Sequence, residues 1–249
     1  MVDIFDLNNE LLAGSLISEY TKYSTYILVK SVFKDDLYNF IAPTVPFHLF
    51  AWEDAKNTIK KNSEGGYHFS YYLKKDDQYH LYLNKFKQKS YFIGLIDTYV
   101  YKQIYTENFA PLEEYVEADD RTIDTFMQVS THCFPEWESN SDFCNYLFFA
   151  QKQEKSMNFL VYLGNEVAGI GSVFYSTALD IAYITNMGTL PSFRNRGIQK
   201  RLLKHISNYV EGKGVHRLYS IVEPNSISHN NFLKQGFETI DTYVVFQKE

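Results

Sequence analysis

The sequence predicts an α/β fold in the broad sense, an α+β arrangement in which a mixed sheet packs against helices. Strand-like and helix-like segments alternate over residues 115–247 in the order β-α-α-β-β-β-α-β-α-β. Within this order, the strand-like segment 181–187 leads through a loop with one glycine into an amphipathic helix. Aromatic residues make up 17% of the 249 residues, which excludes a disordered chain.

Composition also excludes several classes of protein. The net charge of −6 argues against a nucleic-acid partner. No segment approaches 18 consecutive apolar residues and the first residues lack a basic region, so we expect neither a membrane span nor a signal peptide. Cys133 and Cys144 are the only cysteines and form no Cys-x-x-Cys, which favours a reduced cytoplasmic location without a structural metal. The oligomeric state cannot be inferred.

A change in composition predicts two domains, 1–106 and 107–249, with the boundary near residues 106–111. The first segment holds 13 of the 21 tyrosines and none of the five arginines, and its 12 lysines balance 12 acidic residues. The second segment carries 12 basic against 18 acidic residues, and therefore the whole net charge.

The first segment is predicted to be a smaller α+β domain of unknown role. Its expected elements are a helix at 10–20, a strand at 25–32, a helix at 53–61, a hairpin of strands 67–73 and 79–83, and a strand at 90–101. It shows no acid/base or metal constellation, and its tyrosine-rich strands are typical of half-buried sheet faces. One hypothesis is that it is a degenerate copy of the second fold.

The boundaries of helices and strands are clearer in the second segment. A strand at 115–118 precedes a helix that starts at Asp119 and Asp120 and runs to 131, and a helix at 142–153 follows. Gly164-Asn165 joins strands 158–163 and 167–175 in a hairpin. The remaining expected elements are a strand at 180–190, a helix at 198–210, a strand at 216–222, a helix ending near 235 and a strand at 242–247.

The loop and helix start at 191–200 have the properties of a phosphate cradle. The first-turn amides of a helix lack intrahelical acceptors, and the helix dipole adds partial positive charge there. Gly197 has no Cβ, so a ligand can approach the backbone, and Arg194, Arg196 and Lys200 add charge. The phosphate-loop pattern Gly-x-x-x-x-Gly-Lys-Ser/Thr is absent. The alternative is an ordinary strand-to-helix turn.

Two motifs give this segment a family resemblance. Arg194-x-x-Gly197-x-Gln199 resembles the Arg/Gln-x-x-Gly-x-Gly/Ala loop of the GNAT superfamily of N-acetyltransferases, with Gln199 departing from the pattern. Asn225-x-x-Ser228-x-x-x-Phe232-x-x-x-Gly-Phe resembles the family's Asn-x-x-Ala-x-x-x-Tyr-x-x-x-Gly-Phe. The motifs occur at the family's spacing and in its element order. The resemblance implies a GNAT-like acyl-CoA-binding fold with splayed central strands.

By this resemblance the cosubstrate is acetyl-CoA, and its contacts are mostly to the backbone. The pantetheine arm would lie between the splayed strands, and the pyrophosphate at the helix start. The implied cofactor-binding residues are Met187, Gly188, Thr189, Arg194, Asn195, Arg196, Gly197, Ile198, Gln199, Lys200, Asn225 and Ser228.

The implied reaction is direct attack of an amine on the thioester, and it leaves the catalytic residues open. A backbone N–H near Met187 would stabilise the developing oxyanion. Glu223, Asp180 and Tyr183 are candidate bases, as is a chain of ordered water, and each residue has a structural role as its alternative. Cys133 is less favoured as a covalent acyl carrier.

Phe232 stands where the family has a Tyr whose hydroxyl can protonate the departing sulfur. Tyr219, Ser228 or water could substitute. His205 and His216 are expected on the surface, and the direction of His229 is open.

The leading hypothesis is a cytoplasmic N-acetyltransferase with a small-molecule or peptide amine as acceptor. Residues 1–106 are expected to share in substrate selection by lining the acceptor side of the cleft in the second domain. The runner-up is a catalytically weak acyl-CoA-binding or sensing protein. A structural protein whose loop binds nothing is the third reading.

Overall fold

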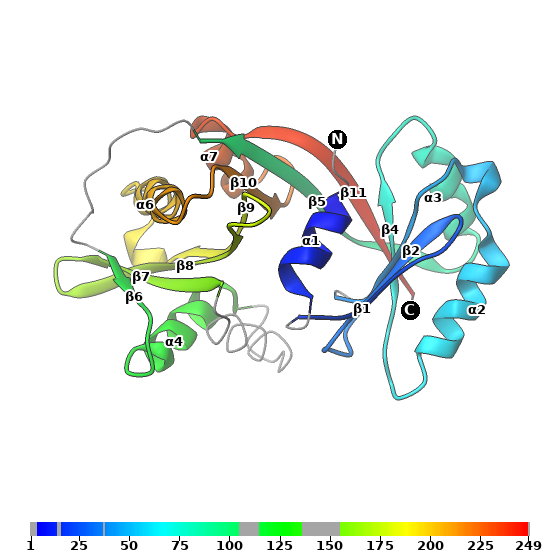
Figure 1. Ribbon diagram of the computed structural model, residues 1–249, viewed down its shortest axis with the longest axis horizontal. Coiled ribbons are helices and arrows are strands. Elements are labelled where there is room, and N and C mark those ends of the chain that lie inside the picture. The colour runs from blue at the N-terminus through cyan, green and yellow to red at the C-terminus, as the bar shows by residue number, and fades with distance from the viewer. Residues whose placement is uncertain (1–3, 14–15, 37, 105–114, 136–154, 249) are drawn as a thin grey trace. The chain divides into compact units, whose positions relative to one another are not determined.

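The computed structural model describes residues 4–13, 16–36, 38–104, 115–135 and 155–248 (Figure 1). The expected helix at 142–153 and the expected boundary at 106–111 lie outside these ranges. The chain forms two compact units: unit 1 comprises Met1–Thr98 and Asp241–Glu249, and unit 2 comprises Tyr99–Ile240. This division differs from the expected 1–106 and 107–249, because the end of the chain belongs to the first unit.

Unit 2 is built on a mixed sheet in the order β6-β7-β8-β9-β10-β5. Its strands are β6 (Tyr115–Glu117), β7 (Ser156–Leu163), β8 (Glu166–Ser176), β9 (Ile181–Thr189), β10 (Arg217–Val222) and the end of β5 (Tyr91–Gln103). The pairs from β6 to β9 are antiparallel, whereas β9 and β10 are parallel. Parallel neighbours need a crossover connection, which here is a helix.

Helices cover both faces of this sheet. Helix α4 (Ile123–Cys133) lies on one face, and α6 (Ile198–Gly212) on the other (Figure 1). A Cβ added at Gly188 would meet Cys133 of α4, and one added at Gly171 would meet Leu202 of α6. Helix α7 (Ile227–Lys234) contributes Phe232 to the cluster that α6 joins. No helix in the described ranges is long and apolar enough to cross a membrane.

The core of unit 2 follows from the periodicity of α6. Leu202, Leu203, Ile206 and Val210 recur at helical spacing, and each has at most 1% of its surface exposed. Burial of each such side chain stabilises the fold by about 1.5–3 kcal/mol. Gly171 allows α6 to pack directly on β8, since any larger residue would displace Leu202.

Unit 1 has the sheet order β1-β2-β3-β4-β11-β5. Its strands are β1 (Ile17–Lys22), β2 (Tyr26–Ser31), β3 (Phe40–Pro43), β4 (Ser70–Lys74), most of β11 (Glu238–Lys248) and the start of β5. Its helices are α1 (Ile4–Leu12), α2 (Trp52–Asn62) and α3 (Tyr79–Lys87). Here too one neighbouring pair, β3 and β4, is parallel and is connected through a helix, α2.

Aromatic rings fill both faces of the unit 1 sheet. Phe5 of α1 packs edge-on against Tyr243, with ring centroids 5.1 Å apart. Phe86 of α3 stacks on Phe246 at 4.7 Å and belongs to a separate cluster with Ala55 of α2. The described tyrosines of residues 1–104 are buried or half-buried, and none is exposed, which agrees with the half-buried sheet faces that the sequence predicts.

Two expected elements of unit 1 are wrong. In place of the helix expected at 10–20, helix α1 ends at Leu12, and Ile17–Lys22 form β1, in which Tyr20 pairs with Val29 of β2. The strand expected at 79–83 is the start of α3, with Tyr82 and Phe86 buried at helical spacing. Five residues are too few to separate a helical period from an alternating one. The other expected elements within the described ranges are confirmed to within a few residues. The largest deviations are the last strand, which begins four residues earlier than expected, and the helix expected from Asp119 and Asp120, which begins at Ile123 after the N-cap Thr122.

The two units exchange a strand. Strand β5 follows α3 of unit 1, yet its end lies beside β10, and Val100 and Ile104 are buried in the core of unit 2. Strand β11 follows α7 of unit 2, yet it pairs with β4, and Val244 and Phe246 are buried in the core of unit 1. Each core is therefore completed by the other half of the chain.

Candidate active site

The central feature of unit 2 is the divergence of its two parallel strands. Pairing between β9 and β10 stops at Ile184 and Ser220, where the Ser220 hydroxyl donates to the Ile184 carbonyl at 2.8 Å. Strand β9 continues to Thr189 and remains paired with β8 on its other edge. The segment from Met187 to Thr189 therefore lies beyond the last pair with β10, where its backbone groups can serve a ligand.

A bulge bends β9 just before this segment. Its register with β8 shifts between Ile170 and Ser172, and Asn186 adopts a left-handed conformation with φ of 52°. The Asn186 amide makes a long hydrogen bond (3.4 Å) to the hydroxyl of Ser172, which itself donates to Asn158 at 2.5 Å. Sequence reasoning missed this bulge, although an Asn in mid-strand is a recognisable signal.

The turn after β9 has the conformation that a phosphate cradle needs. Asn195 and Gly197 are left-handed, with φ of 62° and 74°. The amide of Arg201 bonds the Gly197 carbonyl at 3.1 Å, so the amides of residues 198–200 precede this bond in the first turn of α6. A Cβ at Gly197 would meet nothing within 4 Å, which leaves space for a ligand against the backbone.

Positive side chains surround this turn. Arg194, Arg196 and Lys200 are exposed. The Arg194 Nε contacts the Thr189 carbonyl at 3.4 Å, and the Arg196 guanidinium lies 5.4 Å from the centre of the Phe193 ring. The side chain of Ile198 is buried, so only its backbone can face a ligand. These features fit a pyrophosphate group.

The second predicted wall of the cofactor site is the start of α7. Asn225 follows β10 with φ of 62°, and Ser228 lies in the first turn of α7. Gln199 of α6 donates to the Ser228 hydroxyl at 3.1 Å and accepts from Asn231 at 2.5 Å. The structure thus brings Gln199 and Ser228 together, and the residue that departs from the loop motif links the two helices.

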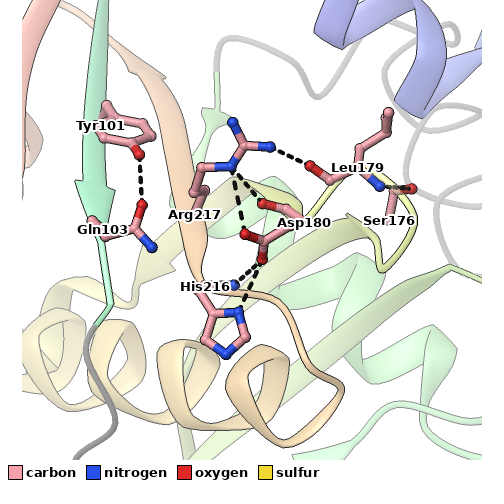
Figure 2. Close-up of polar contacts among 7 residues, drawn as sticks. All are labelled: Tyr101, Gln103, Ser176, Leu179, Asp180, His216 and Arg217. Atoms are coloured by element: carbon pink, nitrogen blue, oxygen red, sulfur yellow. Dashed lines mark hydrogen bonds and ion pairs between the residues drawn. The ribbon is translucent and has the colours of Figure 1, made fainter.

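Asp180 contacts His216 and Arg217 at the start of β10 (Figure 2), and it precedes β9, so it lies at the end of that strand away from the Gly197 turn and is poorly placed to act as the base. Its carboxylate accepts from the backbone N–H of His216 at 2.6 Å, and its carbonyl accepts from Arg217 at 2.9 Å. Because β9 runs from Ile181 to Thr189, Asp180 is separated from the cradle by the whole strand. Its role is to join the starts of β9 and β10.

The other two candidate bases differ in position. Tyr183 stacks on the fully buried Tyr219, with ring centroids 5.0 Å apart, in the paired part of β9 and β10. Glu223 is exposed and directly follows β10, at the end where the strands diverge. Of the three, Glu223 is the residue on the cradle side.

Cys133 lies next to the backbone of β9. A Cβ at Gly188 would come within 2.7 Å of its Sγ. Burial raises the pKa of the Cys133 thiol to about 11, although the charge of Arg194 acts in the opposite direction. The thiol is protonated at neutral pH, which disfavours its use as a nucleophile.

The expectation that His205 is a surface residue is wrong. Its ring stacks on Tyr115 with centroids 4.1 Å apart and meets Phe159 edge-on at 4.9 Å. Burial lowers the pKa of His205 to about 4. His216 is partly exposed, with 43% of its side chain accessible, and its ring nitrogen contacts Asp180 at 3.1 Å.

Phe232 is fully packed, with 1% of its surface exposed, and meets Phe237 edge-on at 4.8 Å. Its possible substitutes as proton donors differ, since Tyr219 is fully buried, whereas the Ser228 hydroxyl accepts from Gln199 and keeps its own proton to donate. Phe232 itself has no hydroxyl that could protonate a departing thiolate.

Known proteins resemble this chain in sequence over one region and in fold over its whole length. Residues 123–237 match the model of the acetyltransferase (GNAT) family. No curated protein matches the sequence significantly. A conserved protein of unknown function from Staphylococcus epidermidis is 12% identical, with a TM-score of 0.72 over 100% of this chain and 98% of that chain.

Two acetyltransferase structures show the same likeness. A GCN5-related N-acetyltransferase from Kribbella flavida is 12% identical, with a TM-score of 0.67 over 98% of this chain and 94% of that chain. The corresponding protein from Sphaerobacter thermophilus is 12% identical, with a TM-score of 0.67 over 100% and 86%. At these identities the likeness establishes a shared fold, and it confirms the mixed α/β, GNAT-like prediction.

Proposed function

We propose that residues 123–237, which match the acetyltransferase (GNAT) family model, serve as an acetyltransferase domain that transfers an acetyl group from acetyl-CoA to a primary amine of a small molecule or peptide. The observation that carries the proposal is the divergence of β9 and β10 beyond Ile184 and Ser220. The chain after β9 then leads to a left-handed turn at Gly197 with open space beside it. This arrangement offers one place for an extended arm and an adjoining place for its pyrophosphate.

The residues divide between these two places. The amides of the first turn of α6 would hold the pyrophosphate, with Arg194, Arg196 and Lys200 adding charge. The backbone of residues 187–189 would bond the amides of the pantetheine arm, and Asn225 would line its other side. Because most of these contacts use the backbone, acetyl-CoA binding is compatible with Gln199 in place of the Gly or Ala of the family's loop motif.

For transfer, the thioester supplies an activated acetyl group that a free amine attacks directly. The N–H of Met187, set by the bulge at Asn186, would donate to the thioester oxygen as negative charge develops. Glu223, or water that it orders, would accept the proton of the amine. A thiolate whose conjugate acid has a pKa of roughly 8.5 leaves at neutral pH with little assistance, so the absence of a Tyr at position 232 is tolerable.

Binding and transfer are tested in two steps. Acetyl-CoA at millimolar concentration should raise the melting temperature, because a ligand that binds only the folded state stabilises it. A panel of amines is then screened by detection of released thiol. A protein that shows no shift in melting temperature is not an acyl-CoA-dependent enzyme.

The second candidate is a catalytically weak acyl-CoA-binding or sensing protein, and Phe232 is the observation that favours it. Phe232→Tyr restores a hydroxyl and should raise turnover by up to about 10²-fold with little change in acetyl-CoA affinity. Phe237→Tyr places a hydroxyl in the same cluster and serves as the matched control. If acetyl-CoA binds tightly but neither wild type nor Phe232→Tyr releases thiol with any amine, the sensing function becomes the better account.

A further inference from the structure

His229 is a buried imidazole that the proposed chemistry does not use. It lies in α7, and only 8% of its surface is exposed. Its Nδ1 is 3.0 Å from the backbone nitrogen of Asn225, and its Nε2 is 3.0 Å from the hydroxyl of Thr239. Both ring nitrogens therefore have a partner.

These partners define the tautomer. A backbone N–H can only donate, so Nδ1 of His229 must be the acceptor. The proton of the neutral ring then resides on Nε2, which donates to the hydroxyl of Thr239. A ring that is oriented from both sides in this way cannot rotate without breaking a buried hydrogen bond.

The group that His229 holds is the turn before α7. Asn225 is left-handed, with φ of 62°, a conformation that is uncommon outside glycine even though asparagine adopts it more readily than most residues. The backbone N–H of His229 also donates to the Ser226 hydroxyl at 3.0 Å, which caps α7. One residue thus bonds the turn through both its ring and its backbone, whereas the side chain of Asn225 stays exposed.

We propose that His229 is the positioning residue for Asn225, fixing the turn so that the Asn225 side chain meets the pantetheine arm of the cofactor. The inference rests on the proposed binding of acetyl-CoA. His229 acts through the Asn225 backbone, anchored at its far side by Thr239, and does not itself touch the ligand. Its contribution is therefore confined to the arm and does not extend to the pyrophosphate.

The test is a double-mutant cycle read by titration calorimetry with two ligands, acetyl-CoA and 3′-phospho-ADP, which lacks the arm. His229→Leu fills the volume but leaves the Asn225 N–H without an acceptor. It should weaken acetyl-CoA binding about tenfold, as should Asn225→Ala, the scale of one lost hydrogen bond. The double variant should be no weaker than either single variant. Affinity for 3′-phospho-ADP should change less than twofold throughout.

Two further variants keep the test decisive if His229→Leu fails to fold. His229→Gln retains an acceptor and a donor and should recover most of the acetyl-CoA affinity. Thr239→Val removes the partner of Nε2 while leaving the ring, and should cause a smaller loss that again spares 3′-phospho-ADP.

Each outcome decides the matter. Additive losses, unchanged acetyl-CoA affinity, or equal losses for both ligands would show that His229 only supports the fold. If wild type binds acetyl-CoA but acetylates no amine, the transfer proposal fails while the cycle still reports on His229. If wild type binds neither ligand, both proposals are overturned.

Discussion

Units 1 and 2 repeat one plan, and they differ where a ligand would bind. In the first half of the chain, α1, β1, β2, β3, α2, β4, α3 and β5 follow one another. Among the described residues after β6, the same succession of element types recurs as α4, β7, β8, β9, α6, β10, α7 and β11. In both successions the third and fourth strands are parallel, and a short 3-10 turn precedes the connecting helix. This correspondence supports the hypothesis that the first half is a degenerate copy of the second.

The turns before the two connecting helices, α2 and α6, differ in the features that favour an anion. Before α6 stands Gly197 with φ of 74°, and the first turn of α6 contains no acidic residue. Before α2 stands Ala51 with φ of −78°, and Glu53 and Asp54 occupy the first turn. Those carboxylates already complement the helix dipole and would repel a phosphate. Topology is shared, but the capacity to hold an anion depends on a few local residues.

The largest effect is expected from cutting the chain between its two halves. A chain of residues 107–249 lacks β5, and with it Val100 and Ile104 of the unit 2 core, so it should not fold cooperatively. Circular dichroism during thermal unfolding measures this. A chain of residues 88–249, which retains β5, is the control and should show more ordered structure. A cooperative transition in 107–249 would show that the exchanged strand is dispensable.

The next largest effect is expected at the turn that distinguishes the units. Gly197→Val should abolish stabilisation by acetyl-CoA, because a branched side chain would occupy the space against the cradle and strain a left-handed residue. Gly214→Val is the matched control, since it has φ of 80° and equally open surroundings at the opposite end of α6. It should lose a similar amount of stability but bind normally. If Gly197→Val binds acetyl-CoA as well as wild type does, the pyrophosphate site does not lie at this turn.

The smallest effect concerns acid sensitivity, which should be greater in unit 2. Burial lowers the folded-state pKa of His205 to about 4, below the ordinary value of roughly 6.5. As pH falls through this window the unfolded state binds the proton first, so the free energy of unfolding decreases, by about 1 kcal/mol given the partial exposure of the ring. His205→Phe should flatten the pH dependence between pH 6.5 and 4 in urea titrations. An unchanged slope would mean that the ring is not desolvated.

Sequence reasoning succeeded where the signal was local. The hairpin at Gly164-Asn165 and the apolar period of α6 are each encoded within about a dozen residues, and both were placed correctly. The turn at Gly197 is also where the sequence predicts a turn, and its use as a phosphate cradle stays a prediction. Strand exchange was not foreseeable in this way. The residues of β5 and β11 are typical of strands, but which neighbour a strand takes depends on contacts far away in the sequence.

The same limit applies within the site. The roles of His229, Gln199 and Asn186 depend on which way a side chain points, and no spacing rule gives that direction. Asp180 is a different case, because the sequence did contain the answer. It precedes the strand that the cradle follows, so it had to lie at the strand's other end.

The exchanged strands also bear on how the protein is made. Unit 1 needs residues 241–249 to cover the edge of β4, and these are synthesised long after Thr98. At ribosomal rates of 5–20 residues per second, this leaves β4 without its neighbour for roughly 10 to 30 seconds. An unpaired edge that waits so long invites pairing with other chains. The half of the molecule that emerges first is therefore the half that must be completed last.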